Sequence, residues 1–354
     1  MDESIYSMKK KKTLFVIYNA RPLQLKLYCF HYNVFINLGK QFPLVFVSLP
    51  SVSGRRFWQH QGIPTFCPFY PSVFNTVPYT SMLLIGQIKA WIKRQIKKVK
   101  AEQVVLIGHT CYFKEKLNLG VKEINITLFE DAFYPFSKAE FDHVDKMLFI
   151  SHKMYQLTKD SFEDKRELYP QFVPDSWLSL HQPRPQNKSI GYFGNLTFER
   201  LDLSLIMNLA DALEDYTFDF HGYFHSEYDE FLFNHLLAKK HNVRYLGGFD
   251  PDSFLTKAKN YHYGWIPYLK TSFNLGCSPT KLYQYLALGM EVISPNLFYE
   301  DSVLPLIHIY QSIEDILKII KQKENRNIKE KTLNYLSKNT VSHRTDQIIK
   351  LIEG

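Results

Sequence analysis

The sequence contains few cysteines and no long apolar run, and each shortage excludes a class of protein. Only four of its 354 residues are cysteines, and they form no Cys-x-x-Cys pair. We therefore expect neither a disulfide framework nor a structural zinc site. The longest apolar runs, such as residues 13–18 and 44–49, are far too short to cross a bilayer. Together with the lack of a recognisable signal peptide, these features predict a cytoplasmic protein.

Two motifs of cofactor-dependent enzymes are also missing. No Gly-x-Gly-x-x-Gly with a downstream acidic residue follows a predicted first strand, which argues against a dehydrogenase that binds a dinucleotide. No Asp-x-Asp motif lies in a convincing loop, and the scattered histidines have no metal-ligand spacing. We therefore expect an activity that needs neither a bound metal nor a cofactor.

Positive charge is concentrated in the first half of the chain. Residues 1–175 contain 24 basic and 15 acidic residues, a net charge of +9, and the remainder has a net charge of −1. Residues 81–100 carry isoleucines at helical spacing, six basic residues and no acidic one. No nucleic-acid-binding motif accompanies this charge, so an anionic membrane or a phosphate-bearing acceptor is the better partner. The alternative is a helix that packs on a sheet and leaves its basic face in water.

Apolar strands alternate with helical segments twice along the chain. The first alternation occupies residues 1–170 and the second residues 189–338, whereas residues 171–188 are rich in Pro and Gln and predict a linker. Such alternation predicts an α/β protein with two doubly wound parallel sheets. The predicted strands are 13–18, 44–49, 104–107, 124–129 and 147–150 in the first lobe, and 189–194, 217–222, 242–246, 262–266 and 291–294 in the second.

The most informative segment is residues 276–289. Ser278 is a good N-cap and Pro279 suits the first helical turn, so we expect a helix to begin there. The unpaired N–H groups and the positive dipole end of this helix would bind an anion. Gln284 shares a helix face with Lys281, which adds a full charge. We therefore predict a diphosphate-and-ribose site, whose polar side chains are Ser278, Thr280, Lys281 and Gln284.

This segment resembles the nucleotide-sugar site of GT-B glycosyltransferases, which often carry S-P-x-K-x-x-E-Y-L-A-x-G there. Further segments match the family in the same order, namely 191–195, 200–203, 242–247, 264–268 and 339–344. The resemblance extends over residues 189–354 and is only general before them. It is strongest to family-4-like members and to enzymes like the bacterial xanthan glucuronosyltransferase, which has a similar K-x-x-Q arrangement. Two departures are that Gln284 replaces a common Glu and that Gly276 stands where many members have another Glu.

The resemblance implies two Rossmann-like lobes that face a cleft, with the last helix, within residues 339–354, crossing back onto the first lobe. It implies an enzyme that moves a sugar from a nucleoside-diphosphate sugar to a glycan or lipid-linked acceptor, with UDP as the expected nucleotide and a guanosine nucleotide as the alternative. Such enzymes build bacterial capsule, exopolysaccharide or lipopolysaccharide, which predicts a peripheral position at the inner face of the cell membrane. In the second lobe, Gly194, Asn195, Arg200 and Tyr268 are expected to surround the donor together with Pro279 and its neighbours.

A carboxylate in the first lobe is the expected catalytic group. Inverting transfer needs a general base, and Glu130 and Asp131 follow the predicted strand 124–129 at the edge that should face the cleft. Successive side chains on an extended chain point to opposite sides, so we expect one of them to act, and we favour Asp131. The alternative for both is a solvated or helix-capping carboxylate. Three histidines are weaker candidates, namely His31, His109 and His152.

A different class of function is also consistent with the sequence. Because the family carboxylates are absent at Gly276 and Gln284, the chain could be an inactive GT-B protein that binds a nucleotide sugar or a partner enzyme.

Overall fold

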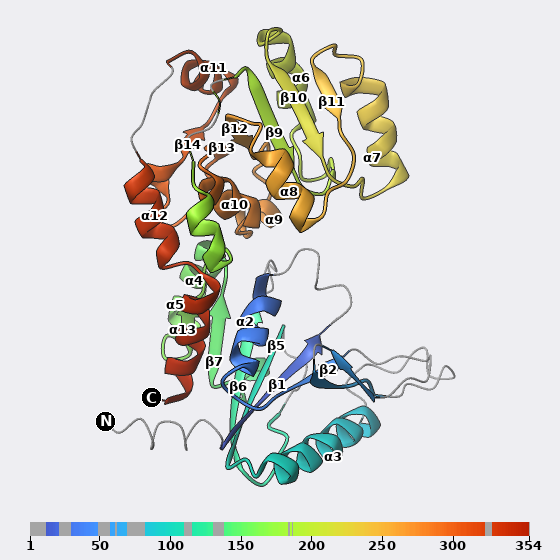
Figure 1. Cartoon of the computed structure of the whole chain (residues 1–354), viewed down its shortest axis with the longest axis vertical. Coiled ribbons are helices and arrows are strands. Elements are labelled where there is room, and N and C mark those ends of the chain that lie inside the picture. The colour runs from blue at the N-terminus through green and yellow to red at the C-terminus, as the bar shows by residue number, and fades with distance from the viewer. Residues whose placement is uncertain are drawn as a thin grey trace.

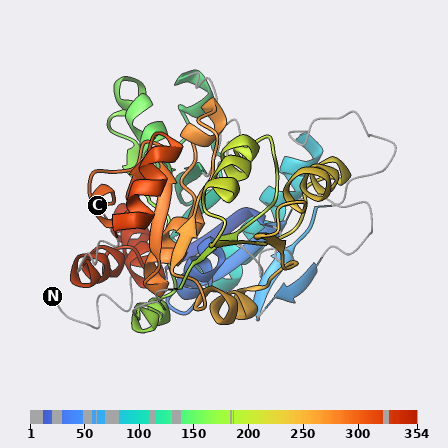
Figure 2. The same cartoon turned by 90° about the horizontal axis from the view of Figure 1, so that it is seen from above.

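The computed structural model describes residues 12–20, 30–48, 57–60, 62–68, 82–109, 115–129, 138–182, 185, 187–322 and 328–353. These residues form two lobes stacked along the long axis of the molecule (Figure 1). Seen along that axis, the second lobe overlies the first (Figure 2). In the described part of the chain, no helix combines the length and the apolar character needed to cross a membrane.

The first lobe contains an eight-stranded sheet in the order β3-β4-β2-β1-β5-β6-β7-β8. All neighbouring strands are parallel except β3 and β4, which form the antiparallel edge. Its strands are β1 (Thr13–Ala20), β2 (Leu44–Ser48), β3 (Phe57–His60), β4 (Ile63–Phe66), β5 (Gln103–His109), β6 (Lys122–Phe129), β7 (Lys146–Phe149) and β8 (Arg166–Leu168). The central strands are buried on both faces, which explains their continuous apolar sequences.

Helices cover both faces of this sheet. The helices of the first-lobe sequence are α2 (Phe30–Gly39), α3 (Met82–Val99), α4 (His152–Leu157) and α5 (Lys159–Phe162). One face packs against α2 and the last helix, α13 (Val341–Glu353), and the other packs against α3. Ile88, Ile92 and Ile96 of α3 are buried, and Trp91 stacks on Phe66 with ring centroids 5.2 Å apart. The apolar face of the basic amphipathic helix therefore belongs to the core and does not face outwards.

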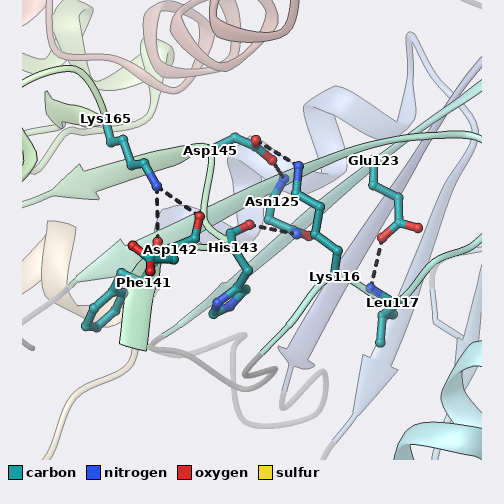
Figure 3. Close-up of polar contacts among 9 residues, drawn as sticks. All are labelled: Lys116, Leu117, Glu123, Asn125, Phe141, Asp142, His143, Asp145 and Lys165. Carbon is teal, nitrogen blue, oxygen red and sulfur yellow. Dashed lines mark hydrogen bonds and ion pairs between the residues drawn. The ribbon is translucent and has the colours of Figure 1, made fainter. Parts of the chain in front are cut away.

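Polar contacts fix the N-terminal edge of this sheet between β6 and β7 (Figure 3). Asp145 accepts the backbone N–H of Asn125 (2.8 Å) and pairs with Lys116 (3.0 Å), while the Asn125 side chain donates to the His143 carbonyl (3.1 Å). The Lys165 ammonium donates to the carbonyls of residues 141 and 142. These charged groups hold strand connections together at the edge remote from the carboxyl ends of the strands.

The second lobe contains a six-stranded, wholly parallel sheet in the order β11-β10-β9-β12-β13-β14. Its strands are β9 (Ser189–Phe193), β10 (Thr217–His221), β11 (Val243–Tyr245), β12 (Tyr263–Trp265), β13 (Glu291–Pro295) and β14 (His308–Tyr310). Its helices are α6 (Leu203–Ala212), α7 (Glu227–Leu232), α8 (Pro251–Ala258), α9 (Ser272–Leu275), α10 (Thr280–Leu288), α11 (Ile313–Gln322) and α12 (Lys329–Ser337). The prediction of two doubly wound parallel sheets is confirmed.

Two adjacent crossings connect the lobes. Residues 173 and 340 form an isolated parallel bridge, so the outgoing and returning segments run side by side. Arg344 is buried at this junction, where its Nε donates to the Pro170 carbonyl (3.0 Å) and its guanidinium lies over Tyr169. From there α13 runs along the first lobe and contacts α2 (Figure 1). The chain thus finishes on the lobe where it began.

Candidate functional site

The helix α10 begins at the carboxyl-terminal edge of the second sheet. Its first residue is Thr280 and its N-cap is Pro279, with no side-chain cap, so the prediction that Ser278 caps the helix is wrong by one residue. The Ser278 side chain instead lines a small pocket together with Tyr283. The amide of Leu282 donates to the Pro279 carbonyl (3.1 Å). The amides of Thr280 and Lys281 have no partner among the described residues and are available to an anion.

The remainder of α10 is anchored to the sheet. The Tyr285 hydroxyl accepts the Phe193 amide at the end of β9 (2.8 Å), and the Tyr285 ring occupies the space that a Cβ on Gly264 would need. The helix ends at Gly289, which adopts φ +78°, the left-handed conformation common for a glycine after a helix. A Cβ there would lie 2.3 Å from the Gln182 carbonyl oxygen. These contacts fix the position of the first turn of α10 relative to β9 and β12.

Lys281 is buried, and its ammonium group lies between two phenols. Its Nζ donates to the hydroxyls of Tyr192 and Tyr268, each at 2.9 Å, and lies 4.0 Å and 4.8 Å from the two ring centroids. Burial, and then the charge of Arg200, hold the pKa of Lys281 well below its ordinary value. An anion placed against Nζ would raise this pKa again. The cluster is therefore suited to receive negative charge.

Gly194 allows the lysine to approach the backbone closely. A Cβ on Gly194 would lie 2.5 Å from Lys281 Nζ and 3.0 Å from the Tyr192 hydroxyl oxygen. The Tyr192 hydroxyl in turn donates to the carbonyl of Asn195, whose side chain is exposed (2.8 Å). The amide of Gly194 donates to the His221 carbonyl (2.9 Å), which ties this turn to the end of β10. The turn after β9 is thus shaped around the lysine.

Arg200 forms the second cation of the site. Its Nε donates to Asn274 Oδ1 (3.0 Å) and its Nη2 lies 3.4 Å from the sulfur of Cys277. The guanidinium lies over the rings of Tyr268 and Phe273, at 5.0 Å and 4.7 Å from their centroids. Asn274 is fully buried and also donates to the backbone carbonyls of residues 200 and 269. Arg200 is therefore held in place by both its side chain and its backbone.

The structure brings together four of the predicted donor-site residues, namely Gly194, Arg200, Tyr268 and Lys281. Thr280 and Gln284 are half-buried on α10, and their side chains make no hydrogen bond with the described residues. Sequence reasoning missed Tyr192 and Asn274. The signal for Tyr192 was its place inside the predicted Gly-bearing turn, whereas no local pattern identifies Asn274.

The predicted catalytic carboxylates lie outside the described residues. Strand β6 ends at Phe129, at the same edge as the other carboxyl ends, and Glu130 and Asp131 follow it. The side chains of His31 and His109 are likewise outside the described part of the chain. No group of three or more His, Cys, Asp or Glu side chains within the described ranges is arranged to hold a metal ion.

Neither a protein-family model nor a curated protein matches this chain. Solved structures do. The lipopolysaccharide outer core galactosyltransferase WaaB has a TM-score of 0.67 and 15% identity, covering 96% of this chain and 99% of that chain. Anabaena HepE, solved with UDP and glucose, has a TM-score of 0.62 and 11% identity over 97% of this chain and 99% of that one. A trehalose-6-phosphate synthase structure, described for glycosyl transfer with retention, has a TM-score of 0.63 and 12% identity over 96% and 99% of the two chains.

At these identities the likeness shows the fold alone. The similar structures are GT-B glycosyltransferases, and they match nearly the whole length of both lobes. The chain therefore has the GT-B fold, as the sequence predicts. The buried cation cluster lies at the carboxyl ends of β9 and β12, the edge where open α/β sheets bind ligands.

Proposed function

We propose that the protein is a glycosyltransferase that takes a sugar from a nucleoside-diphosphate sugar, with UDP as the nucleotide. The observation that carries this proposal is the convergence of Lys281, Arg200 and the first amides of α10 at one edge of the second sheet. Two cations and helix amides are the groups that bind a diphosphate. The presence of UDP and glucose in HepE supports the same class of donor.

The same groups would stabilise the leaving diphosphate as the glycosidic bond to it breaks. The ammonium of Lys281 and the guanidinium of Arg200 supply charge, and the amides of Thr280 and Lys281 supply oriented donors, so we propose that no metal takes part. Gln284, one turn along α10, would hydrogen-bond the ribose hydroxyls. It donates and accepts, whereas the common Glu only accepts.

We assign the general base to Asp131, with Glu130 as the second choice. Both follow the carboxyl end of β6 in the sequence of the first lobe. A base that removes the proton of the acceptor hydroxyl implies inversion at the anomeric carbon. The trehalose-6-phosphate synthase structure was described for transfer with retention, so determining the anomeric configuration of the product tests this assignment directly.

We propose a glycan or lipid-linked acceptor in bacterial surface polysaccharide synthesis, as for the family-4-like and xanthan-type enzymes that the sequence resembles. WaaB, a lipopolysaccharide outer core galactosyltransferase, supports this context. The exposed basic residues of α3, Lys93, Arg94, Lys97 and Lys98, would hold the first lobe at an anionic inner membrane face. Because the apolar face of α3 is buried, this attraction is electrostatic and should disappear at high salt.

The second candidate is a GT-B protein that binds a nucleotide sugar without transferring it. It is favoured by Gly276, which presents no carboxylate although the backbone there has room for a Cβ. Its φ is −88°, and a Cβ there would meet nothing closer than the Phe273 carbonyl oxygen at 3.4 Å. Neither the backbone conformation nor a clash at Cβ therefore requires glycine at this position.

A thermal-shift panel separates these functions. The probes are UDP, GDP, UDP-glucose, UDP-galactose and UDP-glucuronic acid, followed by an assay for hydrolysis or transfer with the best ligand. Stabilisation by UDP and by one of its sugars, together with turnover, supports the transferase. Stabilisation without hydrolysis or transfer favours the binding protein, and no stabilisation by any probe would refute the donor site.

A further inference from the structure

The first turn of α4 in the first lobe lies against the segments before α10 and after β13 in the second. Ser151 caps α4 by accepting the amide of Met154 (3.4 Å), which fixes the orientation of this turn. The Lys153 ammonium lies 4.7 Å from the centroid of the Phe298 ring. The Met154 sulfur lies 4.0 Å from the position of a Cβ on Gly276. Two consecutive residues, Lys153 and Met154, therefore meet the second lobe beside the proposed donor site.

A small pocket lies between these segments of the two lobes. His152 and Pro170 line it from the first lobe, and Cys277, Ser278 and Glu300 line it from the second. Its volume is about 10 Å³, which is room for one water-sized group. Cys277 also contacts the Arg200 guanidinium, so the pocket adjoins the cation cluster. A ligand held by the cluster could therefore project a single oxygen into this pocket.

His152 presents an unsatisfied nitrogen to its surroundings. Its Nδ1 is buried and has no hydrogen-bond partner in the part of the chain that the structure describes. Its Nε2 lies 3.3 Å from the side-chain nitrogen of Gln156. An amide nitrogen can only donate, so Nε2 accepts in this contact, and the neutral ring carries its proton on Nδ1. Nδ1 is thus a buried donor that lacks an acceptor, an unfavourable arrangement that a ligand oxygen would relieve.

We propose that His152 donates a hydrogen bond from Nδ1 to an oxygen of the bound sugar nucleotide and so positions the donor from the first lobe. This inference rests on the proposed function. The acceptor is an oxygen of the transferred sugar or of the diphosphate, since both would lie next to Ser278. Because Gly276 has no side chain, the polar group at this end of α10 comes from the opposite lobe. His152 is therefore a positioning residue that links donor binding to the contact between the lobes.

Two substitutions test this role. His152→Leu removes the hydrogen-bond donor and replaces the imidazole by an apolar side chain of moderate size. His152→Asn retains a donor, because the Asn amide nitrogen stands about where Nδ1 stands in His. The matched control is His235→Leu, which alters an exposed histidine of the second lobe. Dissociation constants for UDP and for the UDP-sugar with the largest thermal shift are measured by calorimetry, and unfolding of each free variant confirms that it is folded.

We expect His152→Leu to weaken binding of the UDP-sugar by about tenfold, with His152→Asn within about threefold of the unmodified chain and His235→Leu unchanged. Unchanged UDP affinity in His152→Leu identifies a sugar oxygen as the acceptor, and an equal loss for UDP identifies a phosphate oxygen. Unchanged UDP-sugar binding in His152→Leu overturns the proposal, and so does equal impairment of the Leu and Asn variants. If the unmodified chain binds none of these nucleotides, the proposed function fails as well.

Discussion

Binding of the donor diphosphate should be coupled to protonation of Lys281. In the free protein, burial and the nearby Arg200 lower the pKa of this ammonium, and its two hydrogen-bond partners are neutral phenols. A diphosphate against Nζ stabilises the charged form and raises the pKa. At pH values between the pKa of Lys281 in the free protein and its pKa in the complex, binding therefore takes up protons, approaching about one per bound sugar nucleotide. In this range the dissociation constant rises with pH, by at most about tenfold per unit.

Calorimetry in buffers of different ionisation enthalpy measures this uptake. A UDP-sugar is the proper ligand, because UDP ends in a phosphate that itself titrates near pH 6. The variant Lys281→Met removes the charge and retains an apolar side chain. A charged hydrogen bond contributes roughly 1.5–3 kcal/mol, so the variant should bind about 10- to 150-fold more weakly. Its residual binding should show no proton uptake.

The same variant should not lose stability in the absence of ligand. Replacing a buried charge by an apolar side chain of similar volume is often neutral or stabilising. A Lys281→Met protein that melts at the unmodified temperature or above, yet binds the donor weakly, is the expected result. The reasoning is refuted if the variant binds the UDP-sugar as tightly as the unmodified chain, or if the unmodified chain takes up no proton at any pH below the ordinary lysine pKa of about 10.4.

Three further changes have defined outcomes. Gly194→Ala places a Cβ against the buried lysine and should weaken UDP-sugar binding by about tenfold or more; unchanged affinity would show that the lysine can move aside. Asp131→Asn should abolish turnover and leave donor affinity intact, and near-normal turnover would remove this residue from the mechanism. For Glu291, burial opposes ionisation, but hydrogen bonds from His262 and His308 outweigh it and lower the pKa to about 2. The stability that the ionised Glu291 carboxylate contributes is present above its pKa in the unfolded chain and is lost as pH falls toward about 2. Glu291→Gln should therefore lower the free energy of unfolding at neutral pH by at most about 3 kcal/mol. It should also flatten the fall in stability at acid pH, and an unchanged fall would contradict this reasoning.

The sheets could be predicted because their central strands are buried on both faces. Residues 14–18 and 104–107 are apolar throughout, and each run corresponds to the interior of an observed strand. The edge strands β3, β8 and β14, and β4 beside β3, were not predicted. They have only three or four residues each and contain polar residues, so local periodicity carries little signal. Neighbouring strands, and not their own sequences, determine their pairing.

A sequence motif predicted which residues form the donor site, but it did not predict how they are arranged in space. The order of matching segments identified Lys281 and Arg200, yet the sequence gives no sign that the lysine is buried between Tyr192 and Tyr268. Those tyrosines come from 89 and 13 residues away in the chain, so their meeting depends on tertiary packing. The error at Ser278 is a shift of one residue, because Pro279 occupies the N-cap position and the helix begins at Thr280.

The return of α13 to the first lobe affects how the protein must be made. Ile348, Ile349 and Ile352 complete the core on one face of the first sheet, although the ribosome synthesises them after the entire second lobe. Until then, only α2 covers that face of the nascent first lobe, and the rest of the face is buried by a contact between distant parts of the chain. A fragment of residues 1–170 would keep this exposed apolar surface and should aggregate, whereas adding residues 339–354 as a separate peptide should rescue its solubility.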